Sequence, residues 1–281
     1  MKPDTAHRAL DEIERAHLKT PGDDSHLMYR YAAPSDLTGL VRRFWIPVWS
    51  VPAGQESVQR VLQYPVSLLV VAPDYARFYG VTTGLSQTVL TGNGWAVGVM
   101  CTPAAGSLIA AEPMAAFTDR YVEMTDVLGP PAVELVDRVR AVMHRDPQAT
   151  TAHQAAAAAF GDVLRPLLPV DPEGELVNHL VALVEERSDL LRVDQLCADT
   201  GLSERALQRL VHRRLGLTPK WLIQRRRLQE AAERLRSTGG TLAETAAVLG
   251  YADQAHFARD FTRITGTTPG RFVAQHRVVG A

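Results

Sequence analysis

The chain has 281 residues, 46% of them apolar and 22% charged, with a formal net charge of −1. This length and apolar content suffice for two domains that each bury a core. The longest apolar run, VSLLVVA from Val66 to Ala72, is far shorter than the roughly 18 residues of a membrane-spanning helix. The opening segment MKPDTAHRALDEIERAHLK has no uninterrupted hydrophobic stretch of the kind found in secretory signals, so we expect a cytoplasmic protein without a membrane partner.

The small net charge is the sum of an acidic first part and a basic second part of the chain. Residues 1–200 carry 16 Lys and Arg against 25 Asp and Glu, a net of −9, whereas residues 201–281 carry 14 against 6, a net of +8. Lys220 is the only lysine of the second part, so nearly all of its positive charge is arginine. Because arginine suits bidentate contacts to phosphate and guanine, the basic part favours a nucleic-acid partner.

The first 28 residues are predicted to form an arm with a helix from about Asp4 to Lys19, since apolar residues recur there at helical spacing. From Tyr29 to Thr125 the pattern changes to short β-prone runs, from RRFWIPVWSV to WAVGVMC, separated by Gly, Pro and Asn. Many short strands without intervening helices predict a barrel or sandwich over residues 29–128.

Helical periodicity returns at Pro130. The segments PAVELVDRVRAVM and ATTAHQAAAAAFGDVLRPLL predict an antiparallel helix pair that forms a connector over residues 129–168. Three prolines interrupt the pattern in RPLLPVDPEGE and indicate a linker at residues 169–174. A helical domain is expected over residues 175–281, and the fold class expected for the whole chain is α+β.

The helical domain contains an internal repeat. VDQLCADTGLSERALQRLVHRRLGLTP and LAETAAVLGYADQAHFARDFTRITGTTP share one plan, which is a short helix, a glycine turn, a second helix, a glycine and Thr-Pro. Gly201 and Gly250 are expected to adopt positive φ at the turns, and Ser203 and Asp253 to cap the helices that follow. Two helix-turn-helix units therefore stand in series, joined by a rod helix that begins at Pro219.

The second unit, GYADQAHFARDFTRITGTTPGRF, carries a glycine-aromatic pair, Phe257, Phe261, Arg259 and a closing Gly-x-x-Pro. With these features and the doubled unit, the chain from about Glu175 to Arg277 resembles the DNA-binding domain of the AraC/XylS family of bacterial transcription regulators. The segment AVGVMCTPAAGSLIAAEPMAAFTDRYVEMTDVLG resembles the end of that family's degenerate cupin-like sensor domains. The resemblance implies a homodimer that binds double-stranded promoter DNA, with RNA polymerase and a small organic effector as further partners.

The resemblance also implies that the second helix of each unit enters the major groove. The base-reading residues that it implies are Arg205, Gln208, Arg209, Gln254, Ala255, Ala258 and Arg259. Arginine suits guanine and glutamine suits adenine, with a solvated side chain as the alternative at each position. The expected contacts to the DNA backbone are Ser203, His212, Arg213, Arg214, Arg225, Arg226, His256, Arg263 and Arg271. For the RRR cluster at 225–227, a solvated face is an equally open alternative.

Cupin-shaped enzymes hold iron or zinc through histidines on their strands, which raises a metalloenzyme as an alternative. None of the nine histidines falls between Tyr29 and Thr125, and no GxSxG, glycine-rich phosphate loop or HExxH occurs. The two cysteines, Cys101 and Cys197, lack CxxC spacing and are expected in the core. We therefore predict no catalytic residue, no metal and no cofactor.

The strand-rich domain is unusually aromatic, which is the composition of a pocket for a small organic effector. The aromatic residues predicted to line such a pocket are Trp45, Trp49, Tyr64, Phe78 and Trp95. Core packing is the alternative for each of them. Two other functions stay open, namely a regulator whose barrel only dimerises and a cupin-type enzyme with a DNA-binding appendage.

Overall fold

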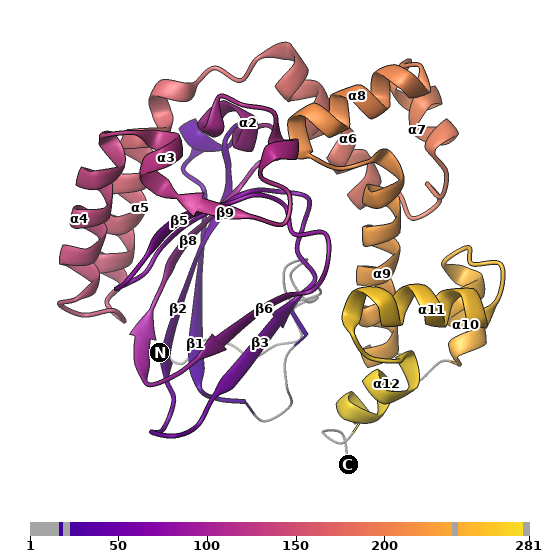
Figure 1. Cartoon of the computed structure of the whole chain (residues 1–281), viewed down its shortest axis with the longest axis horizontal. Helices are drawn as coiled ribbons and strands as arrows, with labels where there is room; N and C mark the ends of the chain where they lie inside the picture. Colours follow the sequence, from indigo (N-terminus) through magenta and orange to yellow (C-terminus); the bar gives the residue numbers. More distant parts are fainter. Residues whose placement is uncertain (1–16, 19–22, 238–240, 278–281) are drawn as a thin grey trace.

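The computed structural model describes residues 17–18, 23–237 and 241–277. It has a strand-rich N-terminal part and a helical C-terminal part (Figure 1), which confirms the α+β class. The helix expected from Asp4 to Lys19 lies almost wholly outside the described residues. None of the described helices has the length and apolar character that crossing a membrane requires.

The N-terminal part is built on a seven-stranded sheet in the order β1-β2-β8-β4-β5-β9, with β7 also paired to β2. Every pairing in it is antiparallel. Its strands are β1 (His26–Ala32), β2 (Val41–Ser50), β4 (Leu68–Val71), β5 (Ala76–Tyr79), β7 (Asn93–Trp95), β8 (Val97–Cys101) and β9 (Tyr121–Glu123). A separate two-stranded sheet pairs β3 (Ser57–Val61) with β6 (Ser86–Leu90). The β-prone runs of the sequence are thus confirmed as strands.

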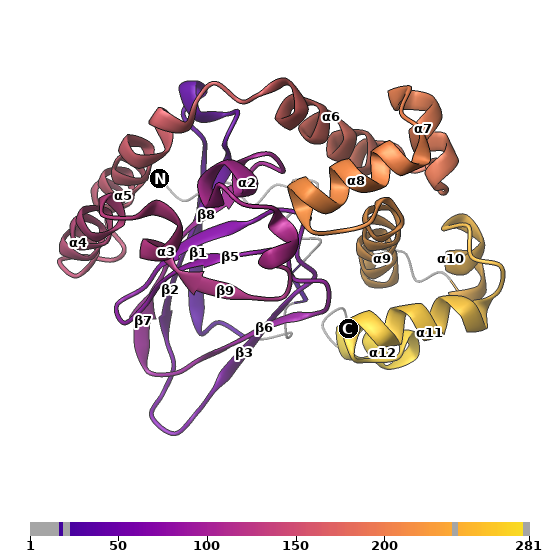
Figure 2. The same cartoon turned by 45° about the horizontal axis from the view of Figure 1, so that its top comes forward.

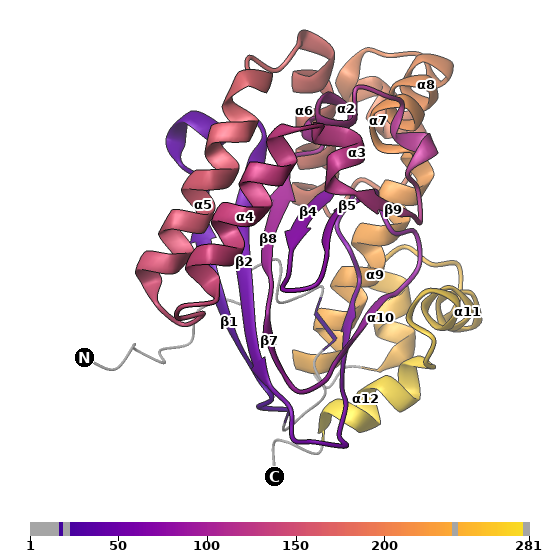
Figure 3. The same ribbon diagram turned by 60° about the vertical axis from the view of Figure 1, so that its left-hand side comes forward.

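Side chains alternate between the two faces of the large sheet, as they must in extended strands. Phe44 of β2 is buried on one face, and its neighbour Trp45 points to the other. The Phe44 face is covered by α4 (Pro131–Met143) and α5 (Thr150–Leu164), which lie side by side in Figure 3 and in Figure 1. The ring of Phe160 on α5 has its centroid 6.4 Å from that of Phe44. We call this the helix-covered face and the opposite one the inner face.

Short helices complete the N-terminal part. They are η1 (Ser35–Leu37), α2 (Ala105–Ala110), η2 (Met114–Ala116), α3 (Met124–Leu128) and η3 (Arg165–Leu167).

The C-terminal part consists of helices arranged around α9. They are α6 (Pro172–Glu186), α7 (Val193–Thr200), α8 (Glu204–Leu215), α9 (Pro219–Ser237), α10 (Leu242–Val248), α11 (Gln254–Thr265) and α12 (Pro269–Arg277). In Figures 1 and 2, α9 lies between the sheet domain and the α10–α11 pair, with α7 and α8 near its start. Helix α6 begins at Pro172, within the expected linker, because the Asp171 side chain caps it by accepting the N–H of Gly174 at 2.6 Å.

The expected repeat is confirmed in its local geometry. Gly201 and Gly250 lie at the start of the turn that follows the first helix of each unit, with φ of 70° and 71°. Ser203 accepts the N–H of Ala206 at 3.3 Å, and Asp253 accepts the N–H of His256 at 2.6 Å, so each second helix has the predicted N-cap. The two helix-turn-helix units therefore follow one plan, with α9 as the rod between them.

The inner face has one close contact that can be tested. Gly98 of β8 lies beneath the Trp45 indole, and a Cβ built at Gly98 would lie 2.1 Å from Trp45 Cε2. Gly98→Ala should therefore displace the indole and destabilise the domain by about 1–3 kcal/mol. The measurement is thermal unfolding with tryptophan fluorescence, and the control is Gly270→Ala, which meets open space. An unchanged midpoint and spectrum for Gly98→Ala would contradict this packing.

Candidate nucleic-acid interface and effector face

Helix α8 is anchored by one face and open on the other. Leu207, Leu210 and Val211 are buried at helical spacing. Arg205 and Arg209 are exposed on the opposite side and make no hydrogen bond or ion pair with any residue that the structure describes. The predicted base-reading residues of the first unit thus lie together on one exposed face. The guanidinium groups of Arg205 and Arg209 on this face have no partner among the described residues.

Gln208, the third predicted reader of α8, is exposed but has a partner. Its amide nitrogen donates to Glu204 Oε1 at 2.9 Å, one helical turn earlier. This bond uses one of the two amide hydrogens and leaves the amide oxygen open, so Gln208 keeps a donor and an acceptor for a base edge.

Helix α11 repeats the arrangement in the second unit. Phe257 and Phe261 are fully buried, with ring centroids 5.6 Å apart. The predicted base-reading residues of this unit are Gln254, Ala255, Ala258 and Arg259, and all but the half-buried Ala258 are exposed. Ala255 and Arg259 lie on the side opposite the phenylalanines, and Gln254 is exposed at the first turn of the helix. Arg259 has no hydrogen-bond or ion-pair partner among the described residues.

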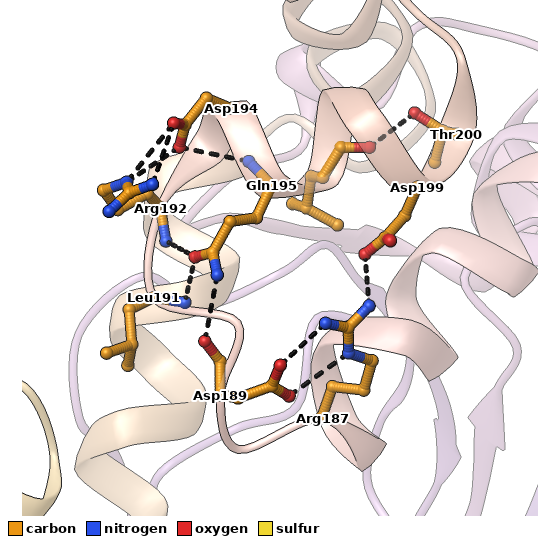
Figure 4. Close-up of polar contacts among 9 residues, drawn as sticks. Arg187, Asp189, Leu191, Arg192, Asp194, Gln195, Asp199 and Thr200 are labelled. Atoms are coloured by element: carbon orange, nitrogen blue, oxygen red, sulfur yellow. Dashed lines mark hydrogen bonds and ion pairs between the residues drawn. The ribbon is translucent and has the colours of Figure 1, made fainter.

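Charged groups hold the supporting helix α7 of the first unit in place (Figure 4). The Arg187 guanidinium at the end of α6 reaches Asp189 Oδ2 at 2.7 Å and Asp199 Oδ2 at 2.6 Å. Gln195 Oε1 accepts the N–H groups of Leu191 and Arg192, both at 2.9 Å. These bonds tie α7 to the segment before it, and the Arg187 contact lowers the pKa of the Asp189 carboxyl. The sequence alone does not indicate this network, since only Asp189 lies near Arg187 along the chain.

A single carboxylate fixes α11 to the rod in the second unit. Asp260 Oδ2 accepts from Gln224 Nε2 of α9 at 2.6 Å, and Asp260 Oδ1 accepts from Arg263 Nη2 at 3.1 Å. His256 Nε2 lies 3.9 Å from the same carboxylate. The orientation of α11 on α9 therefore depends on polar contacts as well as on the phenylalanine core.

Six of the nine predicted DNA-backbone contacts are exposed. They are Ser203, His212, Arg213, His256, Arg263 and Arg271. Ser203 already serves as the α8 cap, and Arg213 pairs with Glu173. Exposed ion pairs such as this one contribute little stability, so phosphate can replace the acid at small cost.

For the other three arginines, the structure corrects the prediction that they contact the DNA backbone. Arg214 is 11% exposed at its side chain and bonds Asp171 at 2.6 Å. Arg225 and Arg226 are 3% and 8% exposed. Arg226 donates to the Leu190 carbonyl oxygen at 2.8 Å, and Arg225 donates to carbonyl groups of the sheet domain. In this conformation none of the three is open to a phosphate, because α9 and the end of α8 turn them toward neighbouring protein.

The aromatic residues predicted to line a pocket divide between the two faces of the sheet. Phe78 and Trp95 are 0% and 4% exposed and belong to the helix-covered core. The Trp95 ring packs edge-on against His144, with centroids 5.5 Å apart. The expectation that these two line a pocket is therefore wrong, because strand alternation directs both into the helix-covered core, Trp95 against His144 and Phe78 against Phe117.

Trp45, Trp49 and Tyr64 belong to the opposite side. Trp45 and Trp49 alternate with the buried residues of β2 and cover Gly98 and Gly94. Tyr64 is 5% exposed and packs in a small cluster that includes Trp45. Three of the five predicted aromatics are thus gathered on the inner side of the sheet.

An arginine flanked by tyrosines extends this inner face across β5 and β9. The guanidinium carbon of Arg77 lies 4.6 Å from the Tyr75 ring centroid and 4.0 Å from that of Tyr121. Arg77 Nε is 3.7 Å from Glu123 Oε1. Burial raises the pKa of Tyr75 to about 12, so its hydroxyl stays protonated. Nothing in the sequence indicates the place of Tyr121, because the β5–β9 pairing joins segments separated by three strands and two short helices.

Among the described residues, no group of three or more His, Cys, Asp or Glu side chains is placed to hold a metal ion. Cys101 is fully buried on β8, and burial raises the pKa of its thiol to about 12. Its placement in the core is confirmed, and such a thiol is inert as a nucleophile.

Comparison with known proteins finds two family matches. Residues 196–275 match a helix-turn-helix domain family, and residues 29–123 match a domain of unknown function (DUF6597). The chain is 30% identical over 100 residues to the probable transcription factor PqrA of Proteus vulgaris, covering 34% of this chain and 82% of PqrA. It is 32% identical over 105 residues to the regulatory protein SoxS of Escherichia coli, covering 37% of this chain and 96% of SoxS.

A solved structure of a probable AraC family transcriptional regulator from Rhodopseudomonas palustris is also similar. It is 27% identical, with 36% of this chain and 97% of that chain covered and a TM-score of 0.33. PqrA and SoxS are each matched over most of their length. This chain belongs to the AraC/XylS family of transcription regulators.

Proposed function

We propose that this protein regulates transcription by placing α8 and α11 in successive major grooves of promoter DNA, under the control of a small organic effector bound at the inner face. The observation that carries the DNA-binding part is the pair of exposed helix faces on one rod. The similarity to transcription factors supports binding rather than catalysis. A second copy of the chain and RNA polymerase are the further partners that the family implies.

Two arginines, one in each unit, are the central base-reading residues in this proposal. Arg209 and Arg259 occupy matching places in the repeat, each on the exposed side of a helix whose other side is buried. A guanidinium without a protein partner can bond guanine O6 and N7 without first breaking an ion pair. Gln208 and Gln254 add amide groups beside them, which suit adenine.

Exposed basic side chains around the base-reading residues supply the affinity that does not depend on the DNA sequence. His212, Arg213, Arg263 and Arg271 are all exposed near the two helices. Each arginine that neutralises a phosphate releases counterions, so binding should weaken steeply with salt.

The effector part of the proposal is supported by the inner face. Trp45, Trp49 and Tyr121 offer ring surfaces there, and Arg77 places a cation among them. Rings with a few convergent polar groups are typical of sites for small organic molecules. Phe78, Trp95 and Tyr64 are buried, so Trp45 and Trp49 remain as the accessible members of the predicted lining.

Substitution separates readers from phosphate contacts. Arg259→Ala should weaken binding to a duplex selected from a random pool by about 1–3 kcal/mol and relax the preference at one or two base pairs. Arg271→Ala should weaken binding to all duplexes and reduce the salt slope by about 1. Both are measured by fluorescence anisotropy at several salt concentrations.

The control for this pair is Arg138→Ala on α4, an exposed arginine paired with Asp162 in the N-terminal part. It should leave both affinity and preference unchanged. If Arg259→Ala and Arg271→Ala cannot be told apart with scrambled competitor DNA, the division between readers and phosphate contacts fails.

Tryptophan fluorescence tests the effector face. In a screen of small organic compounds, a true effector should change the emission saturably and raise the unfolding free energy by about 2.7 kcal/mol at a hundredfold excess over its Kd. The fluorescence change should persist in Trp95→Phe and disappear when Trp45 and Trp49 are both changed to Phe. A response that survives the double change, or that needs Trp95, would place the binding elsewhere.

A further inference from the structure

The arginine cluster of α9 is not explained by DNA binding, and its first member makes an unusual contact. Arg225 lies on the second turn of α9 and is 3% exposed. Its Nη2 donates to the carbonyl oxygens of Thr82 at 3.5 Å, Thr83, and Gly84 at 3.1 Å. These three residues belong to the loop between β5 and β6, residues 80–85, which we call the β5–β6 loop. One buried cation therefore joins the rod to the sheet domain.

The hydrogen-bond partners of Arg225 are neutral carbonyl groups, and the charge of the Asp119 carboxylate offsets only part of the cost of burying the guanidinium. Burial lowers the pKa of the guanidinium to about 10, so the group remains charged at neutral pH. Trp221 lies beneath it, with the ring centroid 4.7 Å from the guanidinium carbon. A buried cation held by carbonyl groups and one ring is a poor source of net stability compared with an apolar side chain. Such a residue is better explained by the geometry that it imposes.

The β5–β6 loop touches both helix-turn-helix units. Val81, at one end of it, is buried in the core of the first unit with Leu207 and Val211. Leu85, at the other end, packs against the cluster in which Leu62 of the N-terminal part meets Phe257 and Phe261 of the second unit. The carbonyl groups that Arg225 binds lie between these two anchors. The loop thus spans from one unit to the other along α9.

The same loop is held on its other side by the sheet domain. Asp119 accepts the Thr83 N–H and the Thr83 hydroxyl, both at 2.6 Å. The loop also follows β5 directly, and β5 carries Arg77 and Tyr79 on the inner face. A change at the inner face of β5 is therefore only a few residues away from the Arg225 contact.

We propose that Arg225 is a positioning residue through which the N-terminal domain sets the placement of both helix-turn-helix units. It holds the β5–β6 loop against α9, and the loop transmits changes at β5 to α8 and α11. The transmission rests on the proposed DNA-binding function, whereas the contact itself does not. Arg225 acts through protein carbonyl groups and not through phosphate.

The contact is tested on the full chain without DNA, by amide hydrogen exchange with mass spectrometry. Arg225→Met should raise exchange at residues 81–85 about tenfold or more, because it removes bonds from a charged donor. Arg225→Lys should retain part of the protection, since an ammonium group also donates to carbonyl oxygens. The matched control is Lys220→Met, which removes an exposed cation from the same helix and should leave the loop unchanged. Unchanged exchange in Arg225→Met would overturn the proposal.

Binding to a duplex selected by the wild-type chain separates the contact from a phosphate contact. The salt slope of Arg225→Met should equal that of the wild type. A slope reduced by about 1, together with unchanged exchange in the loop, would show that Arg225 binds phosphate and would overturn the proposal.

Transmission is tested by reciprocity, because coupling between two sites must act in both directions. Saturating the wild-type chain with the selected duplex should change exchange at Ala76–Tyr79 and in the loop, and Arg225→Met should lose the change at β5. Asp119→Asn weakens the bonds that hold the loop at Thr83, and asparagine tolerates the positive φ of 58° at this position. This variant should also reduce the change in exchange at β5. If Arg225→Met does not fold, Arg225→Lys and Asp119→Asn carry the test.

An undiminished response at β5 in these variants, or none in the wild type, would refute transmission. Failure of the DNA-binding proposal would look different. Arg209→Ala and Arg259→Ala would then leave duplex binding unchanged, while the loop exchange measured without DNA would still depend on Arg225.

Discussion

The C-terminal part depends on one helix that is buried at both ends by different cores. Leu222 and Ile223 of α9 pack into the first unit, and Leu228 and Ala232 pack into the second. Each fully buried aliphatic side chain of this kind contributes about 1.5–3 kcal/mol. Because both units are packed against the same rigid helix, their recognition helices are held in a defined relation. Without this packing, the exposed arginines of α8 and α11 would have no fixed spacing or orientation relative to one another.

The N-terminal part depends on strand alternation in the same fundamental way. A single strand, β2, sends Phe44 to the connector helices and Trp45 to the inner face. Because side chains alternate along the strands, one face of the sheet forms the hydrophobic core and the other carries aromatic rings and arginines. The loop after β5 then brings this domain into contact with α9. The helix-covered core and the inner face are thus two sides of one sheet, and the loop after β5 connects that sheet to α9.

Much of the fold could be predicted from local chemistry. The glycines at the turns, the caps at Ser203 and Asp253, and the apolar stripes of α8 and α11 are all properties of short segments, and they defined both units correctly. The exposure of Arg209 and Arg259 follows from the same periodicity. These features need no knowledge of what lies beyond each unit.

What could not be predicted depends on contacts between distant segments. The environment of Arg225 is decided by the sheet domain and that of Arg226 by the segment between α6 and α7, and nothing in the local RRR pattern indicates either. Alternation shows that Phe44 and Trp45 lie on opposite faces, but only the packing of α4 and α5 decides which face is the core. Phe78 and Trp95 were misplaced for this reason.

The central claim is that both recognition helices read the same DNA from one rod. Hydroxyl-radical footprinting on a selected duplex, with the wild type, Arg209→Ala and Arg259→Ala, tests it most directly. We predict two protected regions on one face of the duplex, about one helical turn or roughly 34 Å apart, with each variant weakening protection in a different region. A single short protected region, or loss of the same region in both variants, would contradict the account.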